Sequence, residues 1–371
     1  MRSDSLSTRD CRYCSAVSQA SGETPIGTAG SLDHWIAIAL PQPRPRQLWA
    51  ARPLLAPLEQ LPKAIAIRRG QRLRLVAISS DRNDYNPDRV RVLHYYRPEG
   101  PFAEFNRSEY LLPETEVVSL VRSILSNPQA RSPFQHYCQK AGKGMRDLFV
   151  CTHTRHDLAC GRYGTPLFRL LYRKYNHLDR LRVWQSSHFG GHRFAPTLMD
   201  FPSGHCWGHL NSDRLEEVLE TLVERQGECQ ILKPFYRGWA GTHKFGQLLE
   251  SELWMQTGWD WLSYRRSARV VQPNLSGLRA FLWQALRIVP GRRALNGRDA
   301  LAMAARQAEV RLDYNRPDGK AESCRARIEV CGQVATMARS DTDERVVLPQ
   351  YRVSILSDTE PLAGSDSRDR A

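Results

Sequence analysis

Apolar and polar positions between residues 147 and 230 alternate in a way that predicts short strands and two amphipathic helices. A stripe of leucines that opens with Pro166 in a first turn predicts the first helix. A second helix is expected after Asn211, where apolar residues recur with helical spacing. The strand-like runs are 148–150, 181–184, 195–201 and 206–210. The resulting order, β-α-β-β-β-α, is that of a thioredoxin-like domain, which we place at residues 145–230.

The segment before this domain has its own pattern of strands and helices. Alternation predicts strands at 34–40, 73–78 and 90–96, and a helical stripe covers 114–126. We therefore expect an α/β module over residues 11–126, preceded by a flexible tail at 1–10. Whether this module is a degenerate thioredoxin-like unit stays open, and it carries no matching cysteine and histidine set.

After the second domain, the pattern predicts a C-terminal extension over residues 231–356. Helical stripes cover 242–257 and 278–288, and strands are expected at 310–314, 325–330 and 346–356, with a hairpin turn at 315–319. The tryptophans between 254 and 283 are expected to pack in a core. Small and charged residues at 357–371 predict a disordered tail. The whole chain is thus expected to be an α/β (α+β) protein.

Composition is that of a soluble globular protein, with 371 residues, 41% hydrophobic and 25% charged. No apolar run is long enough to cross a bilayer and the N-terminus is too polar for a signal peptide, so a cytoplasmic location is expected. The net charge of +14 would suit an acidic partner, such as nucleic acid, an anionic membrane face or an acidic redox protein. Because the basic residues are scattered, a solvated surface is the preferred interpretation and a nucleic-acid partner is not expected.

Nine cysteines, an odd number spread over a long chain, argue against a disulfide framework. Cys11 and Cys14 have the C-x-x-C spacing, but no strand and helix flank them and no second pair follows. We interpret them as ordinary thiols, with Cys14 at a domain edge.

Four potential metal ligands stand just beyond two predicted strands. Cys151 and Cys160 follow the first strand, and His188 and His192 follow the second. Thiolate and imidazole ligands favour zinc or iron-sulfur chemistry over calcium or magnesium. The glycine pair between the histidines weakens a helix and permits positive φ, which predicts a loop that wraps a metal.

These residues resemble the sucrase/ferredoxin-like family. The matching pieces are Cys151, the Arg-x-Asp step at 155–157, Cys160-Gly161, His188-x-Gly-Gly-His192, Trp207-Gly208 and Arg237-Gly238, with weaker similarity at Cys14 and at 27–29. The resemblance implies a thioredoxin-like ferredoxin domain with a [2Fe-2S] cluster. Cys151 and Cys160 would ligate one iron, and His188 and His192 the other. Such ligation raises the reduction potential above that of all-cysteine plant-type ferredoxins.

The preferred function is therefore one-electron transfer or redox sensing with a redox partner protein or a reductase, and no catalytic residue is predicted. The alternative is a zinc-stabilised interaction protein, although Cys-x8-Cys is longer than the usual spacing of zinc cysteines. Cys151 and Cys160 are also too far apart for a C-x-x-C dithiol. His205 and His209 are expected to be strand residues near the site and not ligands.

Overall fold

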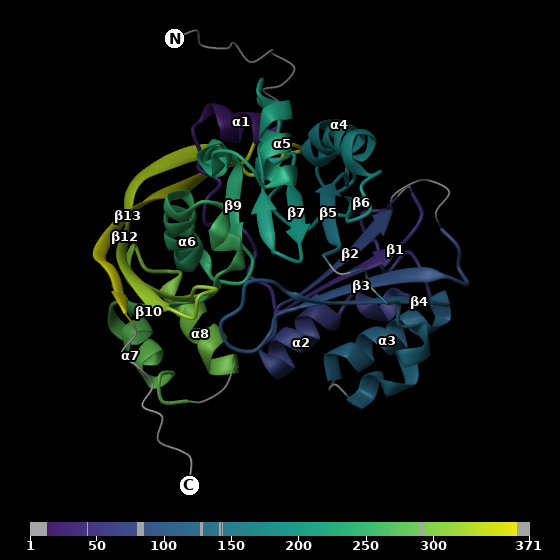
Figure 1. Ribbon diagram of the computed structural model, residues 1–371, viewed down its shortest axis with the longest axis horizontal. Helices are drawn as coiled ribbons and strands as arrows, with labels where there is room; N and C mark the ends of the chain where they lie inside the picture. Colours follow the sequence, from purple (N-terminus) through teal and green to yellow (C-terminus); the bar gives the residue numbers. More distant parts are fainter. Residues whose placement is uncertain are drawn as a thin grey trace.

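The structure, a computed structural model, describes residues 13–42, 44–79, 85–126, 129–140, 142, 144–289 and 292–361. A nine-stranded mixed sheet in the order β4-β3-β1-β2-β6-β5-β7-β8-β9 forms the centre, and a four-stranded antiparallel sheet, β10-β11-β12-β13, packs at one side (Figure 1). The fold class is mixed α/β, as predicted. Within these ranges, no helix combines the length and apolarity needed to span a membrane. The tail predicted at 1–10 lies outside the described residues.

The N-terminal half of the large sheet is formed by four strands, which are accompanied by two helices. Strands β1 and β2 run parallel and are joined through helix α2, whereas β3 and β4 are antiparallel to their neighbours. The elements are β1 (His34–Ala39), α2 (Leu61–Arg69), β2 (Leu73–Ser79), β3 (Val90–Tyr96), β4 (Asn106–Leu112) and α3 (Glu114–Ser126). The pattern did not predict α2, where Pro62 lies in the first turn and therefore costs no hydrogen bond.

The C-terminal half of the sheet contains the thioredoxin-like unit predicted at 145–230. Strands β5 and β6 run parallel, and β7 and β8 continue the sheet antiparallel on the other side of β5. The elements are β5 (Arg146–Cys151), α4 (Leu158–Tyr175), β6 (Leu181–Ser186), β7 (Leu198–Phe201), β8 (His205–Trp207) and α5 (Leu215–Glu224), and β9 (Tyr236–Trp239) forms the edge. This strand order is that of a thioredoxin-like fold.

The two halves share one topology. Their strand orders, β2-β1-β3-β4 and β6-β5-β7-β8, correspond strand by strand. The equivalent edge strands β2 and β6 pair antiparallel through Ile78–Ser186 and Ser79–Gln185, which joins both halves into one sheet. The N-terminal module therefore has the topology of a second thioredoxin-like unit. The proposed limits of the domains remain a prediction.

Helix α4 begins earlier than the sequence pattern predicts. Pro166 was expected in its first turn but lies inside the helix, which starts at Leu158. The reason is the N-cap, because the Asp157 side chain accepts a hydrogen bond from the backbone N–H of Ala159 at 2.9 Å. Cys160 consequently lies in the first turn of a helix and not in a loop.

The C-terminal extension combines helices with the small sheet. The predicted hairpin turn lies between β11 and β12, and β13 continues to Pro361 because it pairs with β12 as far as Glu322. Residues 357–361 of the predicted tail therefore belong to β13, and residues 362–371 lie outside the described part. The elements are α6 (Lys244–Thr257), β10 (Arg265–Pro273), α7 (Gly277–Ala285), α8 (Arg292–Ala302), β11 (Gln307–Asn315), β12 (Ala321–Met337) and β13 (Arg345–Pro361).

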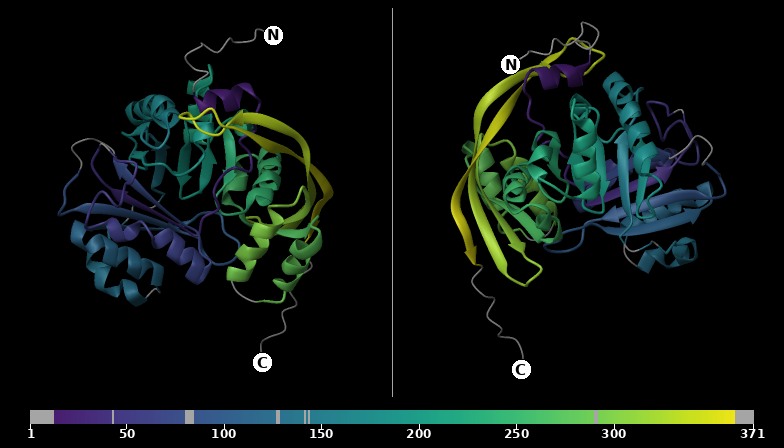
Figure 2. Two further views of the ribbon diagram at one scale, coloured as in Figure 1. Left: turned by 180° about the vertical axis from the view of Figure 1, so that it is seen from behind. Right: turned by 45° about the horizontal axis from the view of Figure 1, so that its top comes forward.

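Shorter segments complete the chain. Helix α1 (Cys14–Ala20) precedes β1, and the long β12–β13 hairpin curves over the molecule until its tip lies beside α1 (Figure 2). The 3-10 helices are η2 (Ala56–Leu58), η3 (Gln129–Tyr137), η4 (His192–Phe194), η5 (Cys229–Phe235) and η6 (Trp259–Ser263).

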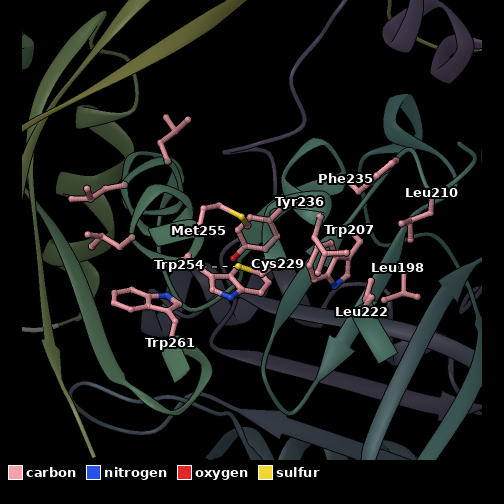
Figure 3. Packing of buried hydrophobic residues seen from close by; sticks show 14 of the residues in the cluster. Leu198, Trp207, Leu210, Leu222, Cys229, Phe235, Tyr236, Trp254, Met255 and Trp261 are labelled. Atoms are coloured by element: carbon pink, nitrogen blue, oxygen red, sulfur yellow. Dashed lines mark hydrogen bonds between the residues drawn. The ribbon is translucent and has the colours of Figure 1, made fainter. Parts of the chain in front are cut away.

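The tryptophan-rich segment packs in the largest core, as predicted. Trp254 is fully buried, and its ring packs against those of Tyr236 and Trp207, with centroids 4.9 and 5.7 Å away (Figure 3). Beneath these rings, the buried Glu250 carboxylate accepts hydrogen bonds from the Tyr236 hydroxyl at 2.7 Å and from Trp261 Nε1 at 2.9 Å. This core holds the extension against the thioredoxin-like unit.

Candidate metal centre

Three of the four predicted ligands converge where two parallel strands end. Cys151 is the last residue of β5, Cys160 stands in the first turn of α4, and His188 follows β6. His188 Nδ1 lies 3.7 Å from Cys151 Sγ and 3.6 Å from Cys160 Sγ. Both thiols are buried. The parallel register places Cys151 opposite Ser186, so the two loops leave the sheet side by side.

The glycine pair makes the predicted tight loop. Gly190 and Gly191 have φ of 106° and 81°, in the region that favours glycine. A Cβ at position 191 would lie 2.3 Å from the guanidinium carbon of Arg237. Arg237 itself donates hydrogen bonds to the Gly190 carbonyl at 3.2 Å and to Cys206 Sγ at 3.3 Å. The loop shape therefore depends on glycine and on the arginine packed beneath it.

The fourth predicted ligand, His192, lies beside the other three but turns one nitrogen away from them. Its ring centroid is 5.7 Å from that of His188. His192 Nδ1 lies 3.4 Å from Asp157 Oδ2 and 3.3 Å from Cys14 Sγ. The ring thus stands between the three converged ligands and a second group of polar side chains.

That second group contains residues that the sequence pattern did not place at the site. Cys14, Asp157 and His192 have ligand atoms within 4.8 Å of one another. Ser340, from the tip of the β12–β13 hairpin, donates a hydrogen bond to Asp157 Oδ1 at 2.7 Å. Cys14 and Asp157 had only the family resemblance as a signal, and nothing in the pattern around Ser340 pointed to the site.

Histidine side chains also cover the converged ligands. The His156 ring stacks on His188, with centroids 3.6 Å apart and an interplanar angle of 13°. His153 Nε2 lies 3.1 Å from the Pro45 carbonyl of the N-terminal unit, and His153 Nδ1 accepts from the His188 backbone N–H at 3.3 Å. The sequence analysis assigned neither residue a place at the site.

The imidazoles at the site are in the neutral form that metal binding requires, because a protonated histidine cannot act as a ligand. Burial lowers the pKa of His188 to about 2 and that of His156 to about 4, and neighbouring histidines add to both shifts. Burial also lowers the pKa of His192, although Asp157 opposes this change. These rings are therefore neutral at physiological pH.

The paired thiols differ in their ionisation. Burial opposes ionisation of Cys151, but hydrogen bonds from the Cys160 thiol and from backbone N–H groups hold the pKa of Cys151 below its ordinary value. The same hydrogen bond, followed by burial, raises the pKa of Cys160 well above its ordinary value. One thiolate is thus favoured, and binding of a metal must release the proton of the other thiol.

An arginine of the N-terminal unit approaches this thiol pair. Arg44 is buried and donates hydrogen bonds to Ser79 Oγ at 2.9 Å and to the Gln185 carbonyl at 3.3 Å. Gln185 precedes the residue paired with Cys151. Burial lowers the pKa of Arg44 to about 10, and the charge on Cys151 opposes that shift. Arg44 therefore stays cationic at neutral pH.

His205 and His209 were expected as strand residues near the site; His205 lies in β8, whereas His209 lies outside the strand. His205 is buried in β8, with Nε2 3.0 Å from Arg266 Nη2. His209 lies beyond β8, and its Nε2 is 3.3 Å from Ser18 Oγ. Neither histidine belongs to a group of potential ligands among the described residues.

The fold and the site together define a mixed α/β protein whose thioredoxin-like unit carries a buried cysteine and histidine group. The chain belongs to the sucrase/ferredoxin-like family, whose model matches residues 25–238. This match covers more than half of the chain and includes Cys151, Cys160, His188 and His192, whereas Cys14 and Ser340 lie outside it.

Two known proteins show similarity to parts of the chain. Altered inheritance of mitochondria protein 32 of Clavispora lusitaniae is 29% identical over 138 residues, which are 35% of this chain and 49% of the relative. The chain thus matches about half the length of that protein. A thioredoxin-like [2Fe-2S] ferredoxin from Aquifex aeolicus is 16% identical, covering 22% of this chain and 84% of its own, with a TM-score of 0.19. That TM-score is too low for the likeness to bear on the fold.

Proposed function

We propose that the protein carries a [2Fe-2S] cluster and acts in one-electron transfer or redox sensing. The observation that carries the proposal is the convergence of Cys151, Cys160 and His188 at the ends of β5 and β6, with His192 adjacent. These are the residues that the family resemblance assigned to the cluster. Two thiolates and two neutral imidazoles are a known ligand set for such a cluster.

Three structural features would hold the four ligands. The end of β5 fixes Cys151, the capped first turn of α4 fixes Cys160, and the glycine loop positions His188 and His192. Asp157 contacts His192 Nδ1, which leaves Nε2 as the nitrogen available to iron. A carboxylate on the second nitrogen is the usual partner of a metal-binding histidine.

When bound, the cluster would supply one-electron chemistry at a potential above that of plant-type ferredoxins. The chain's own residues favour uptake of an electron, because Arg44 places a buried positive charge near Cys151. Because Cys151 and Cys160 are buried, their sulfur atoms are shielded from water. We propose a redox protein or a reductase as the partner, located with this chain in the cytoplasm.

Zinc is the second candidate, and one observation favours it. The three converged ligand atoms lie within 4.8 Å of one another, and donors on one tetrahedral zinc are separated by roughly 3.5 to 3.8 Å. The sulfur to nitrogen distances of 3.6 and 3.7 Å fit that spacing. A zinc-bound protein would have a structural or interaction role and no redox role.

Anaerobic purification of the full chain separates these candidates. We expect a red-brown protein with iron and acid-labile sulfide in equal amounts, and an electron paramagnetic resonance signal after reduction with dithionite. Cys151→Ser, Cys160→Ser and His188→Ala should lose the colour. The matched controls Cys331→Ser and His177→Ala, at exposed positions, should retain it.

Other outcomes have a defined meaning. A colourless protein that holds zinc in equal amount to the chain supports the zinc candidate. A protein that takes up neither a cluster after reconstitution with iron and sulfide nor zinc after incubation with zinc contradicts both. His192→Ala should lose the cluster, whereas a cluster that needs Cys14 in place of His192 would change the ligand set proposed here.

A further inference from the structure

The tip of the β12–β13 hairpin reaches back across the molecule to the start of α4 (Figure 2). The Ser340 backbone N–H donates a hydrogen bond to Asp157 Oδ2 at 3.1 Å, and its hydroxyl donates to Asp157 Oδ1 at 2.7 Å. Arg339 Nη2 donates to the His156 carbonyl at 2.6 Å. Two residues of the tip thus bind the turn that precedes Cys160.

Helix α1 completes this contact. The Cys14 backbone N–H donates to Ser340 Oγ at 3.0 Å, and Cys14 Sγ lies 3.3 Å from His192 Nδ1. Met337 of β12 is buried against Cys14. Both α1 and the hairpin tip lie outside residues 25–238, so the family match does not account for them.

We infer that Ser340 and Cys14 act as a clamp that fixes Asp157 and, through it, the ring of His192. This inference rests on the proposed function, in which His192 is a ligand. The Asp157 carboxylate has four acceptor positions, and the N–H of Ala159, both donors of Ser340 and the His192 ring are placed to fill them. A carboxylate held in this way can orient the imidazole and limit its rotation. Ser340 is therefore a positioning residue.

Ser340→Ala in the full chain tests the clamp. We expect the variant to release its cluster to an iron chelator about tenfold faster or more, followed by the loss of visible absorption. Ser340→Thr, which keeps the hydroxyl, should restore the slow release. Ser354→Ala removes an exposed serine from the same hairpin and should behave as the original protein.

A second readout does not need the cluster. In the metal-free protein, the ring-nitrogen chemical shifts of His192 should change in Ser340→Ala and stay constant in Ser340→Thr. Unchanged shifts together with unchanged cluster release would overturn the clamp. If the original protein takes up no cluster, the proposed function fails, and the chemical shifts still decide whether Ser340 holds His192.

A separate observation concerns helix α7 and the turn after it, at one end of the molecule (Figure 1). Five of their large apolar side chains are 41% to 87% exposed, out of eleven exposed large hydrophobic residues in the described part of the chain. They are Leu278, Phe281, Leu282, Ile288 and Val289, which we call the α7 patch. Large exposed apolar side chains that gather on one short segment are typical of an interaction surface.

Positive charge predominates around the α7 patch. Residues 277–302, which include α7 and α8, contain five arginines and one acidic residue, Asp299. Arg279 and Arg287 are exposed within the patch, and Arg287 and Arg298 lie over the ring of Trp283 at 5.6 and 5.0 Å. The surface thus combines protruding apolar side chains with fixed positive charge.

We propose that the α7 patch docks on an anionic lipid bilayer. A bilayer surface accepts protruding apolar side chains without a complementary groove, and its phosphates pair with arginine. This proposal is independent of the metal centre.

Co-sedimentation of the full chain with lipid vesicles tests the α7 patch. We expect binding to phosphatidylcholine vesicles that contain phosphatidylglycerol, and little binding to phosphatidylcholine alone. Phe281→Ser and Arg287→Glu should each reduce the bound fraction, whereas Val347→Ser, at an exposed position of β13, should not. The proposal is overturned if the chain binds equally well without the anionic lipid, or if both variants bind as well as the original protein. A dimer in solution that Phe281→Ser abolishes would instead assign the patch to a second copy of the chain.

Discussion

Gly191 shows how a single residue shapes the proposed site. Its φ of 81° is one that side chains rarely adopt, and the Arg237 guanidinium occupies the space of a Cβ. Gly190 also has a positive φ of 106°, but no atom lies within 4 Å of a Cβ built there. A side chain at Gly190 would meet backbone strain alone, whereas a side chain at Gly191 would meet both strain and a clash with Arg237.

Gly191→Ala should destabilise the metal-free protein by about 2 to 3 kcal/mol and reduce the cluster content, because strain and a clash act together. Gly190→Ala should cost about 1 kcal/mol, since only strain acts there. Urea unfolding of both variants measures the difference. Equal losses would show that Arg237 moves aside without cost.

A second residue-scale prediction concerns the buried charge of Arg44. Arg44→Gln should lower the reduction potential by tens of millivolts, because an added electron would no longer be attracted by a nearby buried cation. Arg46→Gln removes an exposed arginine from the same loop and should leave the potential unchanged. Potentiometric titration of both variants checks this, and equal potentials for Arg44→Gln and the original protein would exclude the effect.

At the scale of elements, α4 depends on Asp157 for its start. The carboxylate caps the helix through Ala159 and also meets the hairpin tip through Ser340. The periodicity of leucines and Pro166 identified the body of this helix but not its first turn. The Asp157 cap sets the position at which the helix begins, and Cys160 therefore lies within its first turn.

Asp157→Ala should lower the free energy of unfolding of the metal-free protein by about 1 to 2 kcal/mol, as is typical for the loss of an N-cap. Asp157→Asn retains an acceptor for the Ala159 N–H and should cost less. Chemical denaturation of the two variants provides the comparison. A loss in Asp157→Asn as large as in Asp157→Ala would show that the charge, and not the cap, stabilises this end of α4.

At the scale of the whole molecule, several histidines are buried as neutral groups away from the proposed site. Burial lowers the pKa of His94 and His205 well below its ordinary value, and nearby positive groups add to both shifts. Burial also lowers the pKa of His243. In the unfolded chain these rings bind a proton near pH 6.5, whereas the folded protein keeps them neutral.

Below about pH 6.5 the unfolded state therefore binds more protons than the folded state. The contribution of these histidines to the free energy of unfolding is fully present above about pH 6.5 and falls as the pH decreases. Each such histidine should reduce the free energy of unfolding by about 1.4 kcal/mol per pH unit. Urea titrations of the metal-free protein between neutral and mildly acidic pH measure this slope. A stability that stays level over that range would contradict the protonation states described here.

Local sequence alone determined the strands that end at the ligands, the glycine loop, and the fold of the second unit. It did so because strand alternation, helical spacing and the need for glycine at positive φ act over a few residues. The first strands and α3 of the N-terminal unit were found for the same reason. The preference for iron-sulfur over zinc came mainly from the family resemblance, with the long Cys-x8-Cys spacing in support.

Only the tertiary structure decided which groups surround His192 and how the two similar units join. Cys14 and Ser340 are 326 residues apart, and Asp157 and Ser340 are 183 apart, yet they are in hydrogen-bond contact. The β2–β6 pairing likewise joins strands from different units. Contacts over such separations arise when whole elements pack, and the residues that make them leave no periodic signal in the chain.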